Sequence, residues 1–297
     1  MFKNAIIYRF TLPSSINAAS LDTFVPCGPT QEKSSGWVPP RGQEHGDLVE
    51  VIAGQTILKL MTETKSVPGD VIARKAAEVA RHIEQTTGRK PGKKETREIK
   101  DAVKMALLPH AFAKRSATMV WFIPSGFLVI DAASQAKADE AITMLVRSID
   151  GLTVTLVNTN QSPAFSMAHW LIAQEPPQGF SIDRECELKA ADETKAVVKY
   201  GRHPLDIDEV RTHVQGGKIP TKLALTFDGR VSFVLTDAMT LKKISFLDGV
   251  FEEQSSENQS DAFDGDVTIM SGEMRPLFTG LIEALGGELV MQEGGAA

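Results

Sequence analysis

The sequence predicts an α+β fold: a mixed or antiparallel central sheet with packed helices, a projecting helical hairpin and a smaller α+β module. Short apolar strand-like runs and helical runs follow one another without the regular alternation of doubly wound proteins. Asp228-Gly229 between two apolar runs is typical of an antiparallel hairpin with a type I′ turn. The 297 residues, 42% of them hydrophobic, are enough for one or two cores.

The N-terminal part predicts strands of the central sheet. Residues 4–12 are apolar and β-branched, which favours a strand, and residues 49–61 read as one strand or a hairpin. Four prolines in residues 22–40 exclude a helix there. We expect Trp37 to anchor this segment to the core, the alternative being a platform on which nucleic-acid bases stack.

Residues 65–115 separate charge strongly from the rest of the chain. They contain thirteen Lys/Arg and six acids, which gives a formal charge of 13 − 6 = +7. The whole chain carries a net charge of −6, so the other residues together carry −13. A local positive field on an acidic chain points to a polyanionic partner. The alternative is a solvated helical face that only keeps the protein soluble.

Two helices are predicted inside this basic stretch. The first begins near Asp70, read as its cap, and ends in the Gly/Pro-rich break at residues 86–92. The second covers residues 94–108 and ends at Pro109. About fourteen residues at about 1.5 Å each give an antiparallel hairpin arm of about 20 Å. Its outer face and tip carry Arg81, Arg89, Lys90, Lys93 and Lys94.

The middle of the chain predicts a short linker at residues 110–116 and then further strands and helices of the sheet. Residues 118–123 and 127–130 form a hairpin, 136–149 a helix, 153–157 a strand and 164–173 a helix, before a module boundary at 175–179.

Beyond the boundary we expect strands at 187–190, 196–200, 221–227, 230–236 and 241–246, and a helix at 206–215. Residues 248–266 carry seven acids and no Lys or Arg. A strand at 267–270 and a last helix from Ser271 or Glu273 complete the prediction.

Motifs for common chemistries are absent. No P-loop, dinucleotide-binding glycine motif, nucleophile elbow or HExxH sequence occurs, and the two cysteines and six histidines are scattered. We therefore expect no catalytic residue, metal or cofactor. The N-terminus lacks the apolar region of a signal peptide, and no run approaches the ~20 apolar residues of a membrane span, so we expect a cytoplasmic protein without membrane contact.

One enzymatic alternative stays open. A metal-dependent nuclease needs carboxylates that bind a divalent ion and a lysine near the attacking water. Two Glu-x-Lys patterns, each with an acid upstream, contain the residue types that such a site needs. They are Asp47 with Glu63 and Lys65, and Asp183 with Glu187 and Lys189.

Further basic residues suit contacts to phosphates, which need cations along a path and no catalytic geometry. They are Lys114, Arg115, Arg202, His203 and Lys222. Phe112 lies among small residues beside two of them. It is either core or an exposed wedge or interface residue, and the residues alone favour core.

Seven segments in order resemble the bacterial RdgC family of recombination-associated proteins over essentially the whole chain. They are FKNAIIYRF (2–10), VPCG (25–28), GWVPP (36–40), LLPHAF (107–112), FLVIDAAS (127–134), GKIPTKLAL (217–225) and MSGEMRPLFTGLIEALGGE (270–288).

The resemblance implies a ring-shaped homodimer that encloses duplex DNA, binds it regardless of sequence, and also binds single strands. It implies antagonism of the recombinase RecA through occupation of DNA, a nucleoid location, and no catalytic centre. Alternatives are the nuclease above and a module whose basic arm binds an acidic protein.

The resemblance also implies a division of the chain. Residues 1–64, 113–178 and 267–297 form the central domain, 65–112 the tip and 179–266 the gate. Phe112, with His110, contacts the partner subunit, Arg89 matches the basic tip position, and Arg202 with His203 match a pair in the gate. His110 replaces an Arg of the family motif, which makes that contact weaker or dependent on pH.

Overall fold

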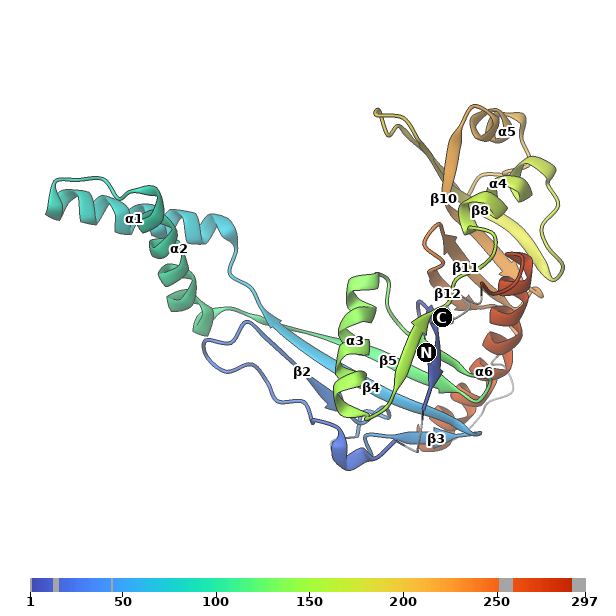
Figure 1. The fold of residues 1–297 in the computed structure, drawn as a ribbon, viewed down its shortest axis with the longest axis horizontal. Coiled ribbons are helices and arrows are strands. Elements are labelled where there is room, and N and C mark those ends of the chain that lie inside the picture. The colour runs from blue at the N-terminus through green and yellow to red at the C-terminus, as the bar shows by residue number, and fades with distance from the viewer. Residues whose placement is uncertain (1, 13–15, 44, 251–258, 290–297) are drawn as a thin grey trace, which may run out of the picture.

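The structure is a computed structural model that describes residues 2–12, 16–43, 45–250 and 259–289. These residues form six α-helices, two short 3₁₀-helices and two antiparallel sheets, which confirms the α+β class. Figure 1 shows an open crescent. A helical arm lies at one end, the second sheet lies at the other, and the first sheet connects them.

The first sheet has seven strands. Its order is β2 (Lys33–Val38), β4 (Gln55–Lys65), β5 (Ala113–Ile123), β6 (Phe127–Ile130), β1 (Ile6–Thr11) and β7 (Thr153–Leu156), and β3 (Glu50–Ile52) also pairs with β4. The helix α3 (Gln135–Ser148) covers one face with Ala138, Ala141 and Leu145, which are fully buried.

Strand β2 lies in the proline-rich segment and was not predicted. Its sequence, KSSGWV, has little β-propensity, so its pairing with β4 decides the conformation. The packing role of Trp37 is confirmed, because its side chain is fully buried and its Nε1 donates to Ser148 Oγ over 3.4 Å.

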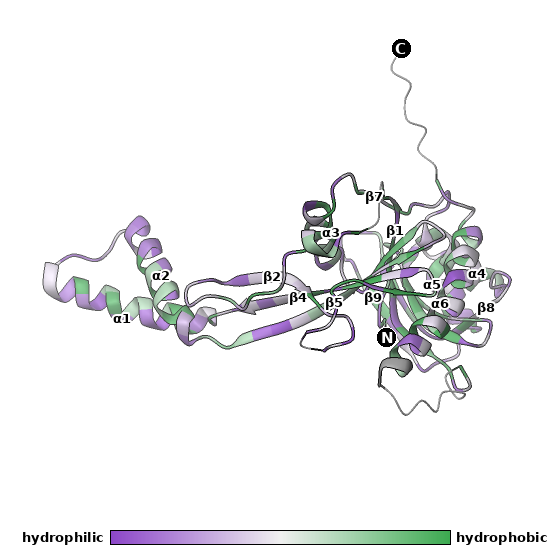
Figure 2. Ribbon diagram, turned by 90° about the horizontal axis from the view of Figure 1, so that it is seen from below, coloured by the Kyte–Doolittle hydropathy of each residue, from purple (hydrophilic) through white to green (hydrophobic). Residues whose placement is uncertain are grey.

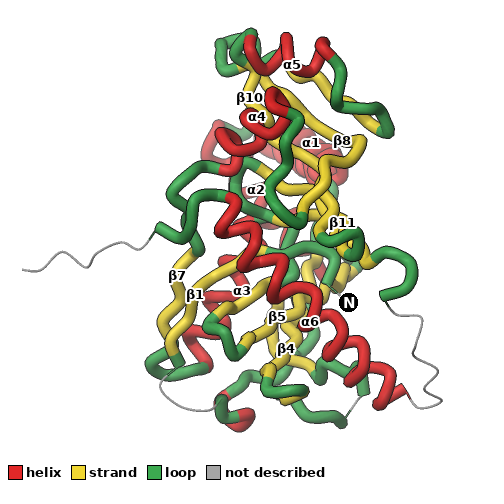
Figure 3. The backbone as a smooth tube through the Cα atoms, turned by 90° about the vertical axis from the view of Figure 1, so that its right-hand side faces the viewer, coloured by secondary structure: helices red, strands yellow, loops and turns green. Residues whose placement is uncertain are grey.

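The second sheet has the order β12 (Leu241–Phe246), β11 (Val231–Thr236), β10 (Lys218–Phe227), β8 (Phe180–Ala190) and β9 (Val197–Gly201). The predicted hairpin is confirmed, with positive φ of 47° at Asp228 and 65° at Gly229, as a type I′ turn requires. The helices α4 (Pro163–Ala173) and α5 (Asp208–Gln215) pack on one face of this sheet, and Figure 3 shows them in front of its strands.

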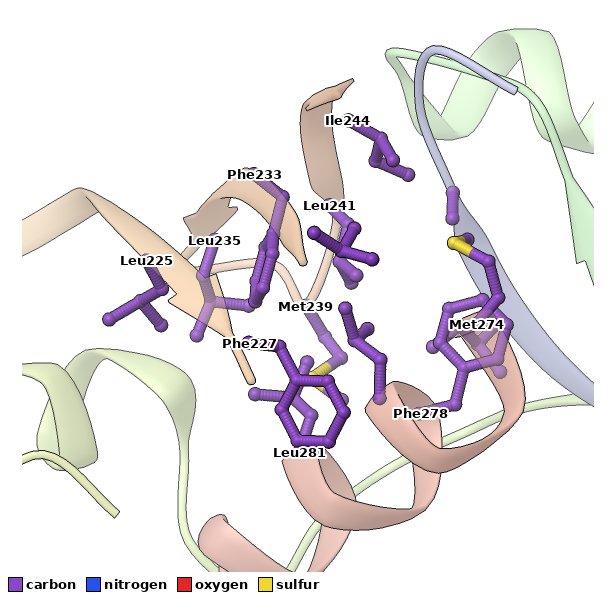
Figure 4. Packing of buried hydrophobic residues seen from close by; sticks show 14 of the residues in the cluster. Leu225, Phe227, Phe233, Leu235, Met239, Leu241, Ile244, Met274, Phe278 and Leu281 are labelled. Atoms are coloured by element: carbon purple, nitrogen blue, oxygen red, sulfur yellow. The ribbon is translucent and has the colours of Figure 1, made fainter. Parts of the chain in front are cut away.

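The last helix, α6 (Gln259–Ala284), packs between the two sheets. Figure 4 shows Met274, Phe278 and Leu281 of α6 near Phe227, the last residue of β10, and Met239, in the turn between β11 and β12.

The predicted strand at 267–270 is wrong, because these residues belong to α6. Val267 and Ile269 are β-branched, but the apolar residues around them recur at helical spacing. Val267, Met270 and Met274 follow this spacing and are all buried on one side of the helix. Of the acidic segment, residues 251–258 lie outside the described residues.

The arm projects from an extended part of the first sheet in which β2 and β5 flank β4 as far as Thr64. Strands β4 and β5 pair without interruption from Thr56 opposite Phe122 to Lys65 opposite Ala113. The predicted linker at 110–116 is therefore wrong from Ala113 onward, because those residues are in β5. Figure 2 shows hydrophilic and hydrophobic residues alternating along the arm, whereas hydrophobic residues concentrate in the body.

The arm consists of α1 (Gly69–Thr87) and α2 (Lys93–Leu107), followed by a 3₁₀ turn at Leu108–His110. The two predicted helices are confirmed, but Asp70 is not the cap: Pro68 holds that position, without a side-chain hydrogen bond. Figure 1 also shows α2 inclined steeply to α1 rather than alongside it. Each helix buries a single residue, so the arm has almost no core of its own.

Candidate nucleic-acid interface

The tip of the arm presents a cluster of cations. Gly88, at φ 73°, ends α1 in the left-handed conformation and turns the chain into the loop that carries Arg89. Arg89 stays 64% exposed while its guanidinium donates to Glu95 over 2.8 Å, which lowers the pKa of that carboxyl.

The lysines of the tip are more loosely paired than Arg89. Lys90 lies 3.8 Å from Glu84, and Lys94 lies 3.9 Å from Glu98. Lys93 is exposed at the start of α2. Exposed ion pairs at such distances contribute little to stability, so these ammonium groups can exchange one anion for another.

The base of the arm carries a different kind of cation. Arg115 donates from Nε to Glu63 Oε2 over 2.6 Å, and the Glu63 side chain is almost wholly buried, whereas Arg115 is 57% exposed. This guanidinium compensates a buried charge and is a structural contact first. Lys114 on the same strand is exposed, as is Arg81 on α1.

Phe112 is 96% exposed at the junction of α2 and β5, so the core reading of this residue is wrong. His110 beside it is exposed, and Met105 on α2 is 47% exposed. An aromatic ring with this exposure buries almost no apolar surface when the single chain folds. It is the largest exposed fraction among the exposed large hydrophobics of the described residues.

The remaining predicted cations lie at the other end of the crescent. Arg202, with φ 56°, and His203 follow β9 in a turn, where the His203 ring contacts the carbonyl of Pro204 at 2.7 Å. Lys222 on β10 donates to Glu187 over 2.9 Å. The predicted site residues therefore lie on elements at opposite ends of the crescent rather than in one patch (Figure 1).

Lys199 and Lys243 were missed as site candidates. Lys199 on β9 lies 3.2 Å from Glu187, so this one carboxylate faces two ammonium groups, and Lys243 pairs with Glu185 at 2.6 Å. The alternating charges of β8 (ECELK) were the available signal, but strand register, which sequence does not give, decides which lysines face them.

The nuclease pattern at Asp47, Glu63 and Lys65 does not form an open carboxylate pair. Both oxygens of Glu63 are used, since Oε1 accepts from the Cys27 backbone N–H over 2.8 Å while Oε2 accepts from Arg115. Lys65 Nζ donates to the backbone carbonyl of Gly28 over 3.0 Å.

The second pattern is engaged in the same way. Asp183 accepts from Thr226 over 2.8 Å, and Glu187 is held by Lys222. In the part of the chain that the structure describes, no group of three His, Cys, Asp or Glu is arranged to bind a metal ion.

The fold and these side chains define an α+β protein of two antiparallel sheets with a projecting cationic arm. A family model described as "Putative exonuclease, RdgC" matches residues 1–288. Proteins named "Recombination-associated protein RdgC" are similar over 97% of this chain and 98% of their own length: 41% identical in Janthinobacterium sp. (strain Marseille) and 42% in Cupriavidus pinatubonensis (strain JMP 134 / LMG 1197). The chain belongs to the RdgC family.

Among the described residues, none of the helices combines the length and the apolar character that crossing a membrane requires.

The network at Glu187 makes stability depend on pH. Hydrogen bonds from Lys222, Thr221 and Lys199 lower the pKa of Glu187 to about 2, below its value in an unfolded chain. The ionised Glu187 therefore makes its full contribution to the free energy of unfolding above about pH 5, and this contribution is lost as the pH falls towards 2. We expect Glu187→Gln to lower the unfolding free energy at pH 7 by on the order of 1 kcal/mol, with the deficit shrinking at pH 3.

Urea denaturation at pH 7, 4 and 3 measures this effect. Glu193→Gln, at an exposed acid of the neighbouring β8–β9 turn, is the control and should change stability little at any of these pH values. A deficit for Glu187→Gln that stays constant with pH would contradict the assignment.

Proposed function

We propose that two copies of this chain form a ring-shaped homodimer that encloses DNA, binds it without sequence preference and performs no bond chemistry. In this proposal residues 65–112 are the tip, residues 179–266 are the gate, and the remaining residues form the centre. Single-stranded DNA is bound by the same cations.

The observation that carries the proposal is the crescent itself (Figure 1), whose two ends bear cations that are exposed. Two such crescents placed end to end leave a central opening with Arg89, Lys93 and Arg202 around it. Phosphate contacts of this kind give affinity without reading base edges. The exposed ion pairs at the tip favour this role, because a phosphate can replace a carboxylate partner at small cost.

Phe112 is proposed to close the ring at the arm end. Large aromatic residues buried at the centre of an interface contribute much of its binding energy. A side chain that is 96% exposed in the single chain has its whole surface available for such burial. His110 lies beside it, where the family motif carries Arg, and is proposed to contribute to the same contact.

The cellular role follows from occupation of DNA. The relatives are named for an association with recombination. A ring that covers nucleic acid without sequence preference limits access of a recombinase such as RecA to the same DNA. This places the proposed site of action on the nucleoid in the cytoplasm.

The description of the family model as an exonuclease favours a second candidate, a metal-dependent nuclease at Glu63 and Lys65. The engagement of both Glu63 oxygens argues against it. We expect purified protein at high excess with Mg²⁺ or Mn²⁺ to leave linear duplex and plasmid intact over hours. Degradation that disappears in Glu63→Gln would replace our proposal with the nuclease, and degradation that persists in it would indicate a contaminant.

Affinity for DNA is expected to depend steeply on salt. If about six phosphates are contacted, affinity falls about a thousandfold between 50 and 200 mM salt. The triple variant Arg89→Ala/Lys90→Ala/Lys93→Ala should bind every sequence more weakly and reduce the slope of log affinity against log salt by about 2 to 3.

Fluorescence anisotropy with several unrelated duplexes measures both quantities. Arg275→Ala removes an exposed cation of α6, on the other side of the first sheet from α3, and serves as the control with unchanged slope. A flat salt response of the native protein contradicts phosphate binding, and a loss limited to certain sequences indicates base readout instead.

Phe112→Ala should weaken dimerisation at least tenfold, because truncation of a central aromatic residue costs more than about 1.4 kcal/mol. Sedimentation equilibrium across a concentration series gives the dissociation constant. Phe165→Ala is the control, since Phe165 is also exposed, at 62%, but lies on α4. An unchanged dimer for a folded Phe112→Ala variant removes this residue from the interface.

A further inference from the structure

The helix α4 is apolar on all sides. Its sequence, PAFSMAHWLIA, contains only two polar residues, Ser166 and His169. A helix with apolar residues around its whole circumference is normally buried on every side. One side of α4 is buried, because Met167, Trp170 and Leu171 belong to the core that it shares with the second sheet. Packing on this sheet therefore accounts for only part of its apolar character.

The opposite side of α4 is uncovered in the single chain. Phe165 is 62% exposed and Ile172 is 38% exposed, and His169 between them is exposed as well. The partly buried Ala168 lies three residues after Phe165 and four before Ile172, so all four side chains share one face of the helix. Apolar residues at these spacings are the pattern by which one helix packs against another.

This face is directed away from the space that the proposed function assigns to DNA. Figure 3 is seen from the end of the crescent opposite to the arm, and it shows α4 in front of the second sheet. The sheet therefore lies between α4 and the arm, and the uncovered side of α4 points outward. Exposed apolar patches of this kind on soluble proteins mark contacts with other macromolecules.

The charges next to the C-terminal end of α4 are negative. Residues 148–183, which include the whole helix, contain no Lys or Arg. The side chain of Gln174, just after the helix, donates to the carbonyl of Leu205 over 3.1 Å. This contact places two exposed acids, Glu175 and Asp206, at the same end of the helix.

The N-terminal end of α4 also lies close to an acid. The backbone N–H of Gln161 donates to the carbonyl of Leu285 over 2.9 Å, and the exposed Glu283 lies two residues earlier on α6. Arg211 of the neighbouring α5 is paired with Asp208 at 2.7 Å. Within the part of the chain that the structure describes, none of the three acids at the ends of α4 takes part in an ion pair.

We propose that the uncovered face of α4 docks an amphipathic helix of another protein, one whose apolar stripe is flanked by Lys or Arg. Phe165, Ala168 and Ile172 pack against that stripe, and the acids at the two ends of α4 pair with the flanking cations. With eleven residues α4 is about 16 Å long, which matches about three turns of a partner helix. Because the cations proposed for DNA lie elsewhere, the protein can bind DNA and this partner together.

A synthetic peptide tests the docking face on the full chain. The probe is a labelled peptide of about eighteen leucines and lysines, with the leucines at helical spacing on one face. The same peptide with glutamate in place of every lysine is the control for charge. Fluorescence anisotropy should show saturable binding of the lysine peptide and at least tenfold weaker binding of the glutamate peptide.

Variants of the protein separate the docking face from general attraction to an acidic chain. Phe165→Gln/Ile172→Gln removes the apolar stripe and should weaken binding of the lysine peptide at least tenfold. Val146→Gln, at a valine of α3 that is 48% exposed, is the matched control and should change binding by less than about twofold. Glu175→Gln/Asp206→Asn should weaken binding by a smaller factor that vanishes at high salt.

Dimerisation and DNA binding of the apolar double variant complete the test, after circular dichroism has established that it folds. Both should equal those of native protein, because the face is reserved for another protein. A weaker dimer in sedimentation equilibrium would make a second copy the occupant, and weaker DNA binding would make it nucleic acid; either result overturns the proposal. Equal binding of the lysine peptide by native protein and the folded variant, or no binding by native protein, overturns it as well.

Discussion

The long pairing of β4 with β5, which carries the first sheet out to the foot of the arm, is the constraint on which the arm and its charges depend. The two strands pair over ten consecutive residue pairs, from Thr56–Phe122 in the core to Lys65–Ala113 at the foot of the arm, and β2 pairs with β4 from Lys59 to Thr64. Their backbone groups therefore stay bonded up to the point where the arm begins. The helices α1 and α2 bury one residue each, so tertiary packing adds little to their stability. The position of Arg89 at the end of the crescent thus follows from the strands that carry the arm rather than from burial of apolar residues within the arm.

The ion pairs divide into two physical classes. The contact of Arg115 with buried Glu63, and that of Lys222 with Glu187, fix the base of the arm and the face of the second sheet, and breaking either leaves a poorly solvated charge. The pairs at the tip are exposed and screened by salt, so they hold a cation in place until a better anion arrives. Under the proposed function, the first class positions the frame and the second contacts phosphate.

Local signals were read correctly at the turns, where local geometry decides the outcome, although the cap of α1 was placed at Asp70 and not at Pro68. Asp228-Gly229 adopts the positive φ that its hairpin turn demands, and Gly88 ends α1 for the same steric reason. Errors arose where a partner element decides: β2 is a strand because β4 pairs with it, and residues 267–270 are helical because α6 packs its apolar side between two sheets. For the candidate site, the sequence located the cations. It did not show that Glu187 engages Lys222 or that Glu63 engages Arg115.

By itself the sequence determined the α+β class, the two-helix basic segment and the separation of charge, because periodicity, turn chemistry and composition are properties of short stretches of chain. Only the tertiary structure decided that Phe112 is exposed, that Lys199 shares a carboxylate with Lys222, and that β9 lies at the edge of the second sheet. Those outcomes depend on strand order and register, which bring together residues far apart in the chain. No local pattern encodes which strand lies at the end of a sheet.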